Sequence, residues 1–131
     1  MTPTVDLLAA VGAHLTAFEL PAITSIHIDT ALSGPQVTVH LTGHQPSALA
    51  QGLLAWADTL TQVTAGAWRV PAGDSVHLSV TGLLPGGASV LVYGSHKTTH
   101  RGLGADLAPD ATTTIPLLMV RHAASIEEAT A

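Results

Sequence analysis

Hydrophobic side chains recur every three or four residues in two stretches of the chain, which is the pattern of an amphipathic helix. Residues 4–19 carry this spacing at Leu7, Leu8, Val11, Leu15 and Phe18. Residues 46–63 carry it at Leu49, Leu53, Trp56, Leu60 and Val63. Pro21 follows the first stretch and Pro46 opens the second, and proline suits both of these positions. We therefore expect helices over 4–19 and 46–63.

Strict alternation of apolar and polar residues marks four further segments as half-buried strands. Residues 22–30 and 36–42 alternate on either side of a link that contains Gly34 and Pro35. Residues 75–82 and 88–95 alternate on either side of Pro85-Gly86-Gly87. Each pair predicts an antiparallel hairpin. Trp68 and Val70 belong to a further short strand that ends at Pro71.

The C-terminal third carries a weaker pattern. Residues 96–111 are polar and contain glycines, which predicts a long loop, and Thr112–Thr114 form a brief strand. Pro116 opens a terminal helix through Ala124, although a strand over 112–120 fits as well, and residues 127–131 form a frayed tail. The sequence thus predicts one α+β domain over residues 1–126, in the order α-β-β-α-β-β-β-(α). It is a two-layer domain with the helices on one face of an antiparallel sheet.

The same alternation predicts a polar second face of the sheet. If Ile28 lies near Val39 in the first hairpin, then His27 lies near His40 and both apolar sets share the other face. The polar face then displays Ser25, His27, Asp29, Thr38, His40, Thr42, His77, Ser79, Thr81 and Tyr93. It carries one formal charge at neutral pH. Threonine favours strands and suits a solvated face, but short uncharged groups also pack well against a partner.

The low share of charged residues bears on whether the polar face has a partner. The chain of 131 residues is 47% hydrophobic, enough for a core, but only 10% charged, well below the roughly 25% of an ordinary soluble domain. A surface poor in charge is often covered by a partner or by a second copy, while a GC-rich genome produces the same composition without any partner. The interface candidates are His27, Asp29, Thr38, His40, Thr42, His77, Ser79 and Thr81.

Charge and composition also argue against several kinds of partner, site and location. The net charge is −5, and Arg69, Lys97, Arg101 and Arg121 form no run, so we expect no duplex nucleic-acid partner. The absence of cysteine excludes disulfides, zinc–thiolate sites and a cysteine nucleophile. Asp6 and His14 interrupt any signal-peptide core, and no apolar run is long enough to span a membrane. These features predict a cytoplasmic protein without a membrane partner.

Two histidine groups are candidates for chemistry. His27, His40 and His77 share the polar face and could hold a divalent transition metal if their strands are adjacent. His96 and His100 have HxxxH spacing beside Arg101 and Asp106, but the glycines around them indicate a loop and the glutamate of a zinc protease is missing. No nucleophile elbow, P-loop or complete dinucleotide fingerprint is present. We therefore expect no enzyme activity and no cofactor.

The runs LLAWADTL at 53–60 and AWRVPAGDSVHLSVTGLLPGG at 67–87 resemble short uncharacterised proteins of high-GC actinobacteria and of their mobile elements or phages. The resemblance covers about the middle third of the chain and implies a setting without an activity, cofactor or site residue.

We expect a non-enzymatic interaction or self-assembly module that binds itself or another protein. The alternatives are a small-ligand or metal-binding protein and a structural component of a phage or mobile element. If His27 and His40 face each other, protonation places like charges across the strands, so stability or association falls as the pH drops through about 6.5.

Overall fold

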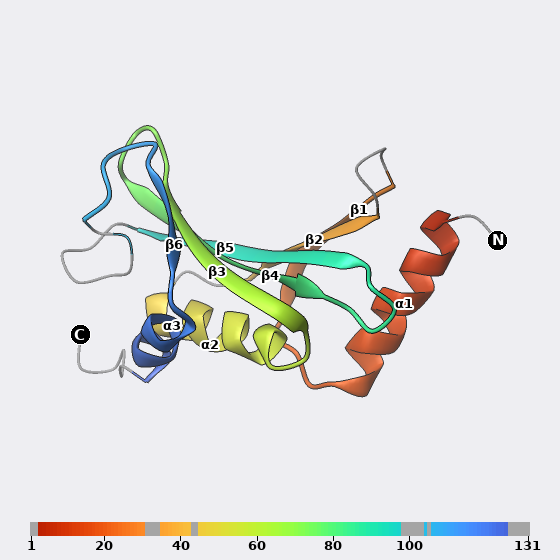
Figure 1. Cartoon of the computed structure of the whole chain (residues 1–131). Helices are drawn as coiled ribbons and strands as arrows, with labels where there is room; N and C mark the ends of the chain where they lie inside the picture. The colour runs from red at the N-terminus through yellow and green to blue at the C-terminus, as the bar shows by residue number, and fades with distance from the viewer. Residues whose placement is uncertain (1–2, 31–34, 43–44, 98–103, 105, 126–131) are drawn as a thin grey trace.

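The computed structural model describes residues 3–30, 35–42, 45–97, 104 and 106–125. It confirms the α+β class and the expected order, with one further short strand before the last helix (Figure 1). The helices are α1 (Pro3–Ala17), α2 (Pro46–Ala57) and α3 (Leu117–Ala124). The strands are β1 (Ile23–Asp29), β2 (Gln36–Leu41), β3 (Thr61–Arg69), β4 (Ser75–Leu83), β5 (Ser89–Lys97) and β6 (Thr112–Ile115).

All six strands form one sheet in the order β1-β2-β5-β4-β3-β6. Both predicted hairpins, β1–β2 and β4–β5, are antiparallel. The sheet is nevertheless mixed, not wholly antiparallel as expected, because β2 and β5 run parallel to each other. Since α2, β3 and β4 all lie between β2 and β5 in the chain, the two hairpins join along strands that are distant in sequence.

The hydrophobic core lies between the sheet and the helices. Val76, Leu78 and Val80 of β4 alternate with half-buried polar residues, and β5 repeats the pattern with Val90 and Val92. These side chains are buried against α2. The largest buried side chains of α2 are Leu49, Leu53 and Trp56. The core is therefore built from aliphatic side chains around one large aromatic residue, Trp56, which is 1% exposed.

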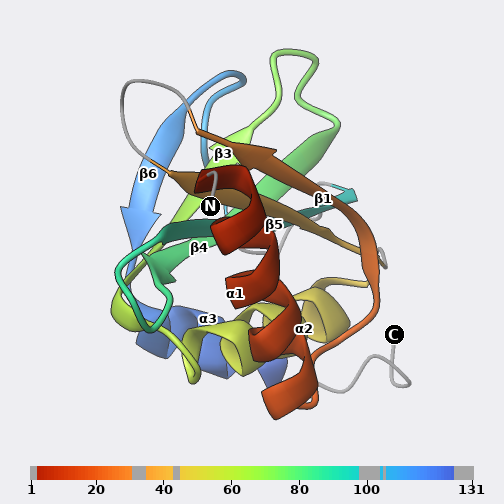
Figure 2. The same ribbon diagram turned by 90° about the vertical axis from the view of Figure 1, so that its right-hand side faces the viewer.

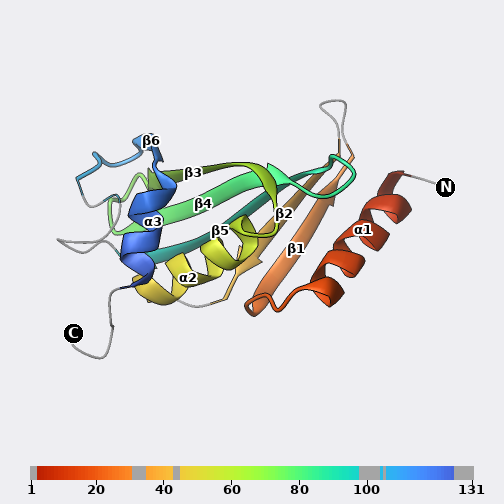
Figure 3. The same ribbon diagram turned by 60° about the horizontal axis from the view of Figure 1, so that its bottom comes forward.

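The three helices lie on one side of the sheet. α2 and α3 lie side by side beneath the strands (Figure 1). α3 contributes the buried Val120, and the amide of Gln51 on α2 donates to the carbonyl of Ala124 at 2.9 Å. α1 lies near β1 at the margin of the sheet (Figure 3), and its C-terminal part meets the end of α2 through His14. Figure 2 shows that the opposite side of the sheet carries no helix.

The second helix is shorter than its periodicity predicts. α2 ends at Ala57, and Leu60 and Val63 belong to the following turn and to β3. The hydroxyl of Thr59 donates to the carbonyl of Trp56 at 2.7 Å, which closes the last turn. Thr61, Val63 and Thr64 are β-branched and favour a strand. Leu60 is still buried, so it keeps its predicted place in the core although it leaves the helix.

The predicted loop over 96–111 begins later than expected. His96 and Lys97 are the last residues of β5, and His96 points to the core side, where it is 3% exposed. The brief strand at 112–114 is β6, extended to Ile115, and the terminal helix is present, so the strand alternative for 112–120 is wrong beyond Ile115. The predicted tail, 127–131, lies outside the described residues.

Two strand glycines give a matched test of this packing. A Cβ atom on Gly82 would lie 2.9 Å from Cβ of Leu60 and 3.1 Å from the carbonyl oxygen of Thr61, whereas on Gly66 it would meet nothing closer than 3.4 Å. We expect Gly82→Ala to lower the free energy of unfolding by about 1–3 kcal/mol. Gly66→Ala removes the flexibility of glycine without a clash, so it should leave the free energy of unfolding unchanged or raise it. Urea denaturation of both variants measures the difference, and equal stability of the two would contradict the register of β3 and β4.

Candidate functional site

The face of the sheet that carries no helix, called the open face below, is the candidate site. Its central part comes from the alternating residues of β2, β5, β4 and β3 that point away from the core. Among the strand residues placed on it, only Asp29 and Lys97 carry a formal charge at neutral pH, and each is the last residue of its strand. The middle of the open face is therefore free of formal charge.

A row of four rings crosses the open face from β2 to β3. The ring of His40 stacks on Tyr93 with the centroids 4.7 Å apart and the planes 2° from parallel. His77 stacks on the ring of Tyr93 at 5.8 Å and 10°. Because β5 lies between β2 and β4, the two imidazoles cover opposite faces of the phenol ring. Trp68 then meets His77 at 5.1 Å in an edge arrangement. The four residues form what is called the ring row below.

The three stacked rings of the ring row leave no gap between them. In the stack of His40, Tyr93 and His77 the flat faces are turned toward one another, so no planar ligand fits between them. Each stacked pair at such distances contributes about 0.5–1.5 kcal/mol beyond the area it buries. The edges of the three stacked rings carry imidazole nitrogens and one phenol oxygen. The row is thus a stiff polar ridge without charge.

The outer end of the ring row is fixed by a carboxylate. The indole Nε1 of Trp68 donates to Oδ1 of Asp110 at 3.1 Å. Asp110 has a positive φ of 66°, and its backbone N–H donates to the carbonyl of Arg69 at 2.8 Å. This hydrogen bond to Arg69 attaches the segment before β6 to the end of β3. The orientation of the indole therefore depends on the end of the β3–β6 pairing where Trp68 lies opposite Thr112.

Burial lowers the pKa of the His77 imidazole, and the nearby His40 lowers it further because two positive charges would repel each other. A proton on His77 would also place a charge in the uncharged middle of the open face. The neutral form of His77 is therefore the one that suits the ring row.

The predicted polar-face residues lie on the face expected of them, but one predicted pair is wrong. His27 is opposite Thr38, and His40 is opposite Ser25, so His27 and His40 are not direct neighbours across the strands. The faces are nevertheless right, because Ile26 pairs with Val39 and Ile28 with Val37. The register is shifted by two residues from the expected one, and a shift of two preserves the face of every side chain.

The remaining interface candidates flank the ring row or lie at its margin. Ser79 is opposite Tyr93, and Thr38 and Thr81 lie on either side of Leu91. Thr42 follows the end of β2, where its hydroxyl lies 2.8 Å from that of Thr24. Asp29 ends β1. The sequence did not single out Leu91, which the alternation of β5 places on the same face.

The geometry separates the three histidines proposed as metal ligands. His40 and His77 have the ring of Tyr93 between them, and His27 lies on the edge strand β1. Ligands of one zinc ion each lie about 2.0–2.1 Å from it, which a ring inserted between two of them prevents. In the described part of the chain no group of three or more His, Asp or Glu side chains is placed to hold a metal ion.

The second group of candidates does not form a site among the described residues. His96 is buried in the core, where Nδ1 lies 2.8 Å from the carbonyl oxygen of Lys97. Nε2 of His96 has no hydrogen-bond partner there. Asp106 is exposed, whereas His100 and Arg101 lie outside the described residues.

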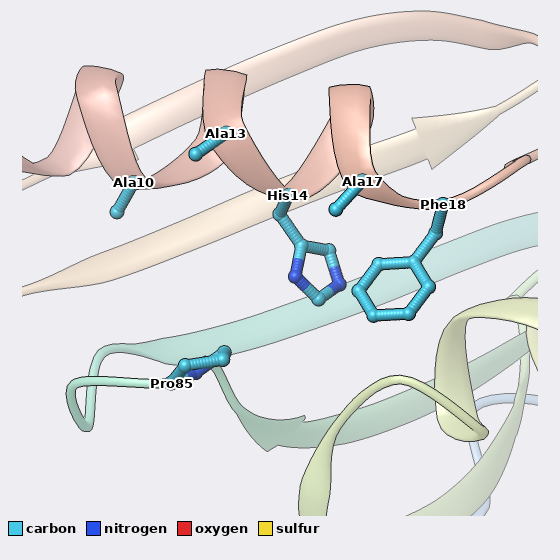
Figure 4. Close-up of a pocket in the computed structure, with 6 residues that line it drawn as sticks. All are labelled: Ala10, Ala13, His14, Ala17, Phe18 and Pro85. Atoms are coloured by element: carbon cyan, nitrogen blue, oxygen red, sulfur yellow. The ribbon is translucent and has the colours of Figure 1, made fainter.

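A shallow groove lies between α1 and the turn of the β4–β5 hairpin (Figure 4). It is lined by Ala10, Ala13, His14, Ala17, Phe18 and Pro85. His14 is buried, stacks on Trp56 at 5.6 Å, and its Nε2 lies 2.8 Å from Oγ1 of Thr59. Since that hydroxyl donates to Trp56, it accepts from Nε2–H of His14. Burial lowers the pKa of His14. Its contacts join α1 to the end of α2, which is a structural role that the sequence did not reveal.

None of the helices in the described parts of the chain combines the length and apolar character needed to cross a membrane.

Stability should fall in mild acid because of His77. Its pKa is lower in the folded chain than in the unfolded chain, so the unfolded chain takes up the proton first. The contribution of neutral His77 is complete above pH about 6.5 and is lost as the pH falls below that value. We expect the melting temperature to decrease from pH 7.5 to 5, and His77→Gln to reduce that decrease.

The residual slope of the variant comes from His14, whose pKa is shifted in the same direction. A His122→Gln variant is the control. His122 lies on α3, on the helix side of the sheet, whereas the ring row lies on the open face. If His77→Gln and His122→Gln had equal effects on the slope, the ring row would not be the cause.

No protein-family model, curated protein or solved structure matches this chain. We therefore infer a function from the geometry of the open face itself.

Proposed function

We propose that this protein is a non-enzymatic interaction module that binds a second copy of itself or another protein through the open face. The single observation that carries the proposal is the ring row in the middle of an uncharged sheet face. Tyrosine and tryptophan are enriched in protein interfaces and at their energetic centres. Tyr93 and Trp68 are both in this row.

The surroundings of the ring row favour a protein partner over a small ligand. Thr38, Leu91 and Thr81 form a neighbouring row across β2, β5 and β4, and no long charged side chain stands among them. A partner that covers this surface desolvates short hydroxyls, ring edges and one leucine, and it buries no unpaired charge. The cost of covering the face is therefore low over a broad area.

The rigidity of the ring row supports the same proposal. Binding is weakened by the entropy lost when mobile side chains become ordered, about 0.5–1.5 kcal/mol for each long side chain. His40, Tyr93 and His77 are already held by stacking, and Trp68 by its hydrogen bond to Asp110. A partner meets a surface that is already ordered. A larger assembly, as in a phage or mobile-element component, would use the same face and differ in oligomer size.

A matched pair of substitutions tests the proposal. Thr81→Arg places a charge on the open face beside Leu91, and Thr113→Arg places the same charge on β6, where Thr113 is exposed and pairs with the core-side Ala67. Light scattering over a concentration series should give a mass above that of the monomer for the wild type and for Thr113→Arg. Thr81→Arg should shift the association to at least tenfold higher concentration.

Circular dichroism and melting temperatures of both variants establish that they fold. Equal association of Thr81→Arg and wild type would overturn the role of the open face in self-association. A wild type that stays monomeric at high micromolar concentration, and from which no partner is recovered whose binding Thr81→Arg weakens, would overturn the proposal entirely.

A further inference from the structure

The two edges of the sheet differ in how well they are protected against another strand. β6 has four residues and is followed directly by Pro116, which has no N–H to donate. β1 has seven residues, contains no lysine or proline, and its one charge is at its last position, Asp29. Natural proteins protect exposed edges with short strands, proline, lysine, β-bulges or charges that point inward. β1 has an irregularity between Ile23 and Ser25 and is regular from Ser25 to Asp29.

An exposed apolar residue stands in the middle of β1. Ile26 is 38% exposed although it pairs with Val39, which is fully buried. The neighbouring Ser25 and His27 are exposed as well. α1 lies at the same margin of the sheet (Figure 3). It exposes Val5 and Leu8, at 49% and 55%. Three of the large exposed hydrophobic residues of the described chain therefore lie on the two elements at this margin.

We propose that β1 is an interface between two copies of this chain, in which β1 pairs antiparallel with β1 of the second copy about a two-fold axis at Ile26. An edge strand offers a row of backbone N–H and C=O groups, and the occupant that satisfies such a row is another extended strand. A second copy presents the same edge, and a two-fold axis makes the contact closed and self-complementary.

The register about Ile26 is the one that the side chains favour. It places Ile26 against Ile26 of the second copy on the helix side, so the exposed side chain becomes buried. It places Ser25 opposite His27, so the two imidazoles do not face each other. An axis at His27 would instead set the two imidazoles directly against each other, and Ile26 would not be buried against its own copy.

This inference goes beyond the proposed function, because it concerns a strand edge and not the open face. The two surfaces are nevertheless related. An antiparallel pair of edges about an axis perpendicular to the sheet leaves both open faces on the same side. The dimer would therefore present two ring rows on one continuous sheet, and a partner with two binding sites could engage both.

The absence of cysteine allows a direct test of the axis. In the proposed pair, Ile26→Cys brings two thiols together with Cα atoms about 4.5–5.5 Å apart, as for opposite residues of an antiparallel pair. That spacing lies within the roughly 4.4–6.8 Å of natural disulfides. Mild oxidation of Ile26→Cys should give mostly covalent dimer. Ser25→Cys should give several-fold less, and Thr113→Cys, on the other edge of the sheet, should stay monomeric.

A second variant keeps the test independent of oxidation. Ile26→Lys adds the charge that edge strands commonly carry, and it should convert a dimer to a monomer in sedimentation velocity without loss of the melting transition. A monomeric wild type, or equal crosslinking of Ile26→Cys and Thr113→Cys, would overturn the inference. Thr81→Arg introduced into the Ile26→Cys chain should leave crosslinking unchanged, so failure of the edge interface and failure of the open face are separate results.

Discussion

The register of β2, β5 and β4 is the constraint on which both the core and the open face depend. Val39, Val92 and Val80 lie side by side in these strands and are fully buried on the helix side. Because successive side chains of a strand point to opposite faces, burial of these valines also places His40, Tyr93 and Ser79 side by side on the open face. A slip of one residue would put the valines in water, so the hydrophobic core holds the ring row in place.

The sequence predicted well what depends on neighbours along the chain. Alternation located both hairpins and assigned the side chains of β1, β2, β4 and β5 to the correct face, because a strand shows its buried side by a period of two. It failed where two local patterns overlapped. Leu60 and Val63 continue the helical spacing of α2, but the β-branched residues around them follow the strand preference, and the core accepts Leu60 from the turn just as well.

Pairing between strands that are distant in the sequence could not be predicted from local alternation. Nothing in residues 36–42 indicates that they lie parallel to residues 89–97, because the parallel contact of β2 and β5 joins two hairpins that are distant in the sequence. The arrangement of the candidate site could not be predicted for the same reason. His40, Tyr93 and His77 each had the expected face, yet only the strand order places Tyr93 between the two imidazoles. The same order turns a possible cluster of metal ligands into a stack of rings.

The low charge of the chain has a different consequence at each of its surfaces. On the open face it removes the desolvation cost that a lysine or glutamate would impose on a partner. At β1 it removes the protection that a lysine would give to an edge strand. Deep in the core it has no consequence, since Val76, Val90 and Leu53 would be apolar in any protein of this class. A composition produced by a GC-rich genome alone would dilute charge over the whole surface without regard to position. The charges of the open face instead stand at strand ends, at Asp29 and Lys97, so its centre and residues Ser25–Ile28 of β1 carry no formal charge, an uneven distribution that composition alone does not predict.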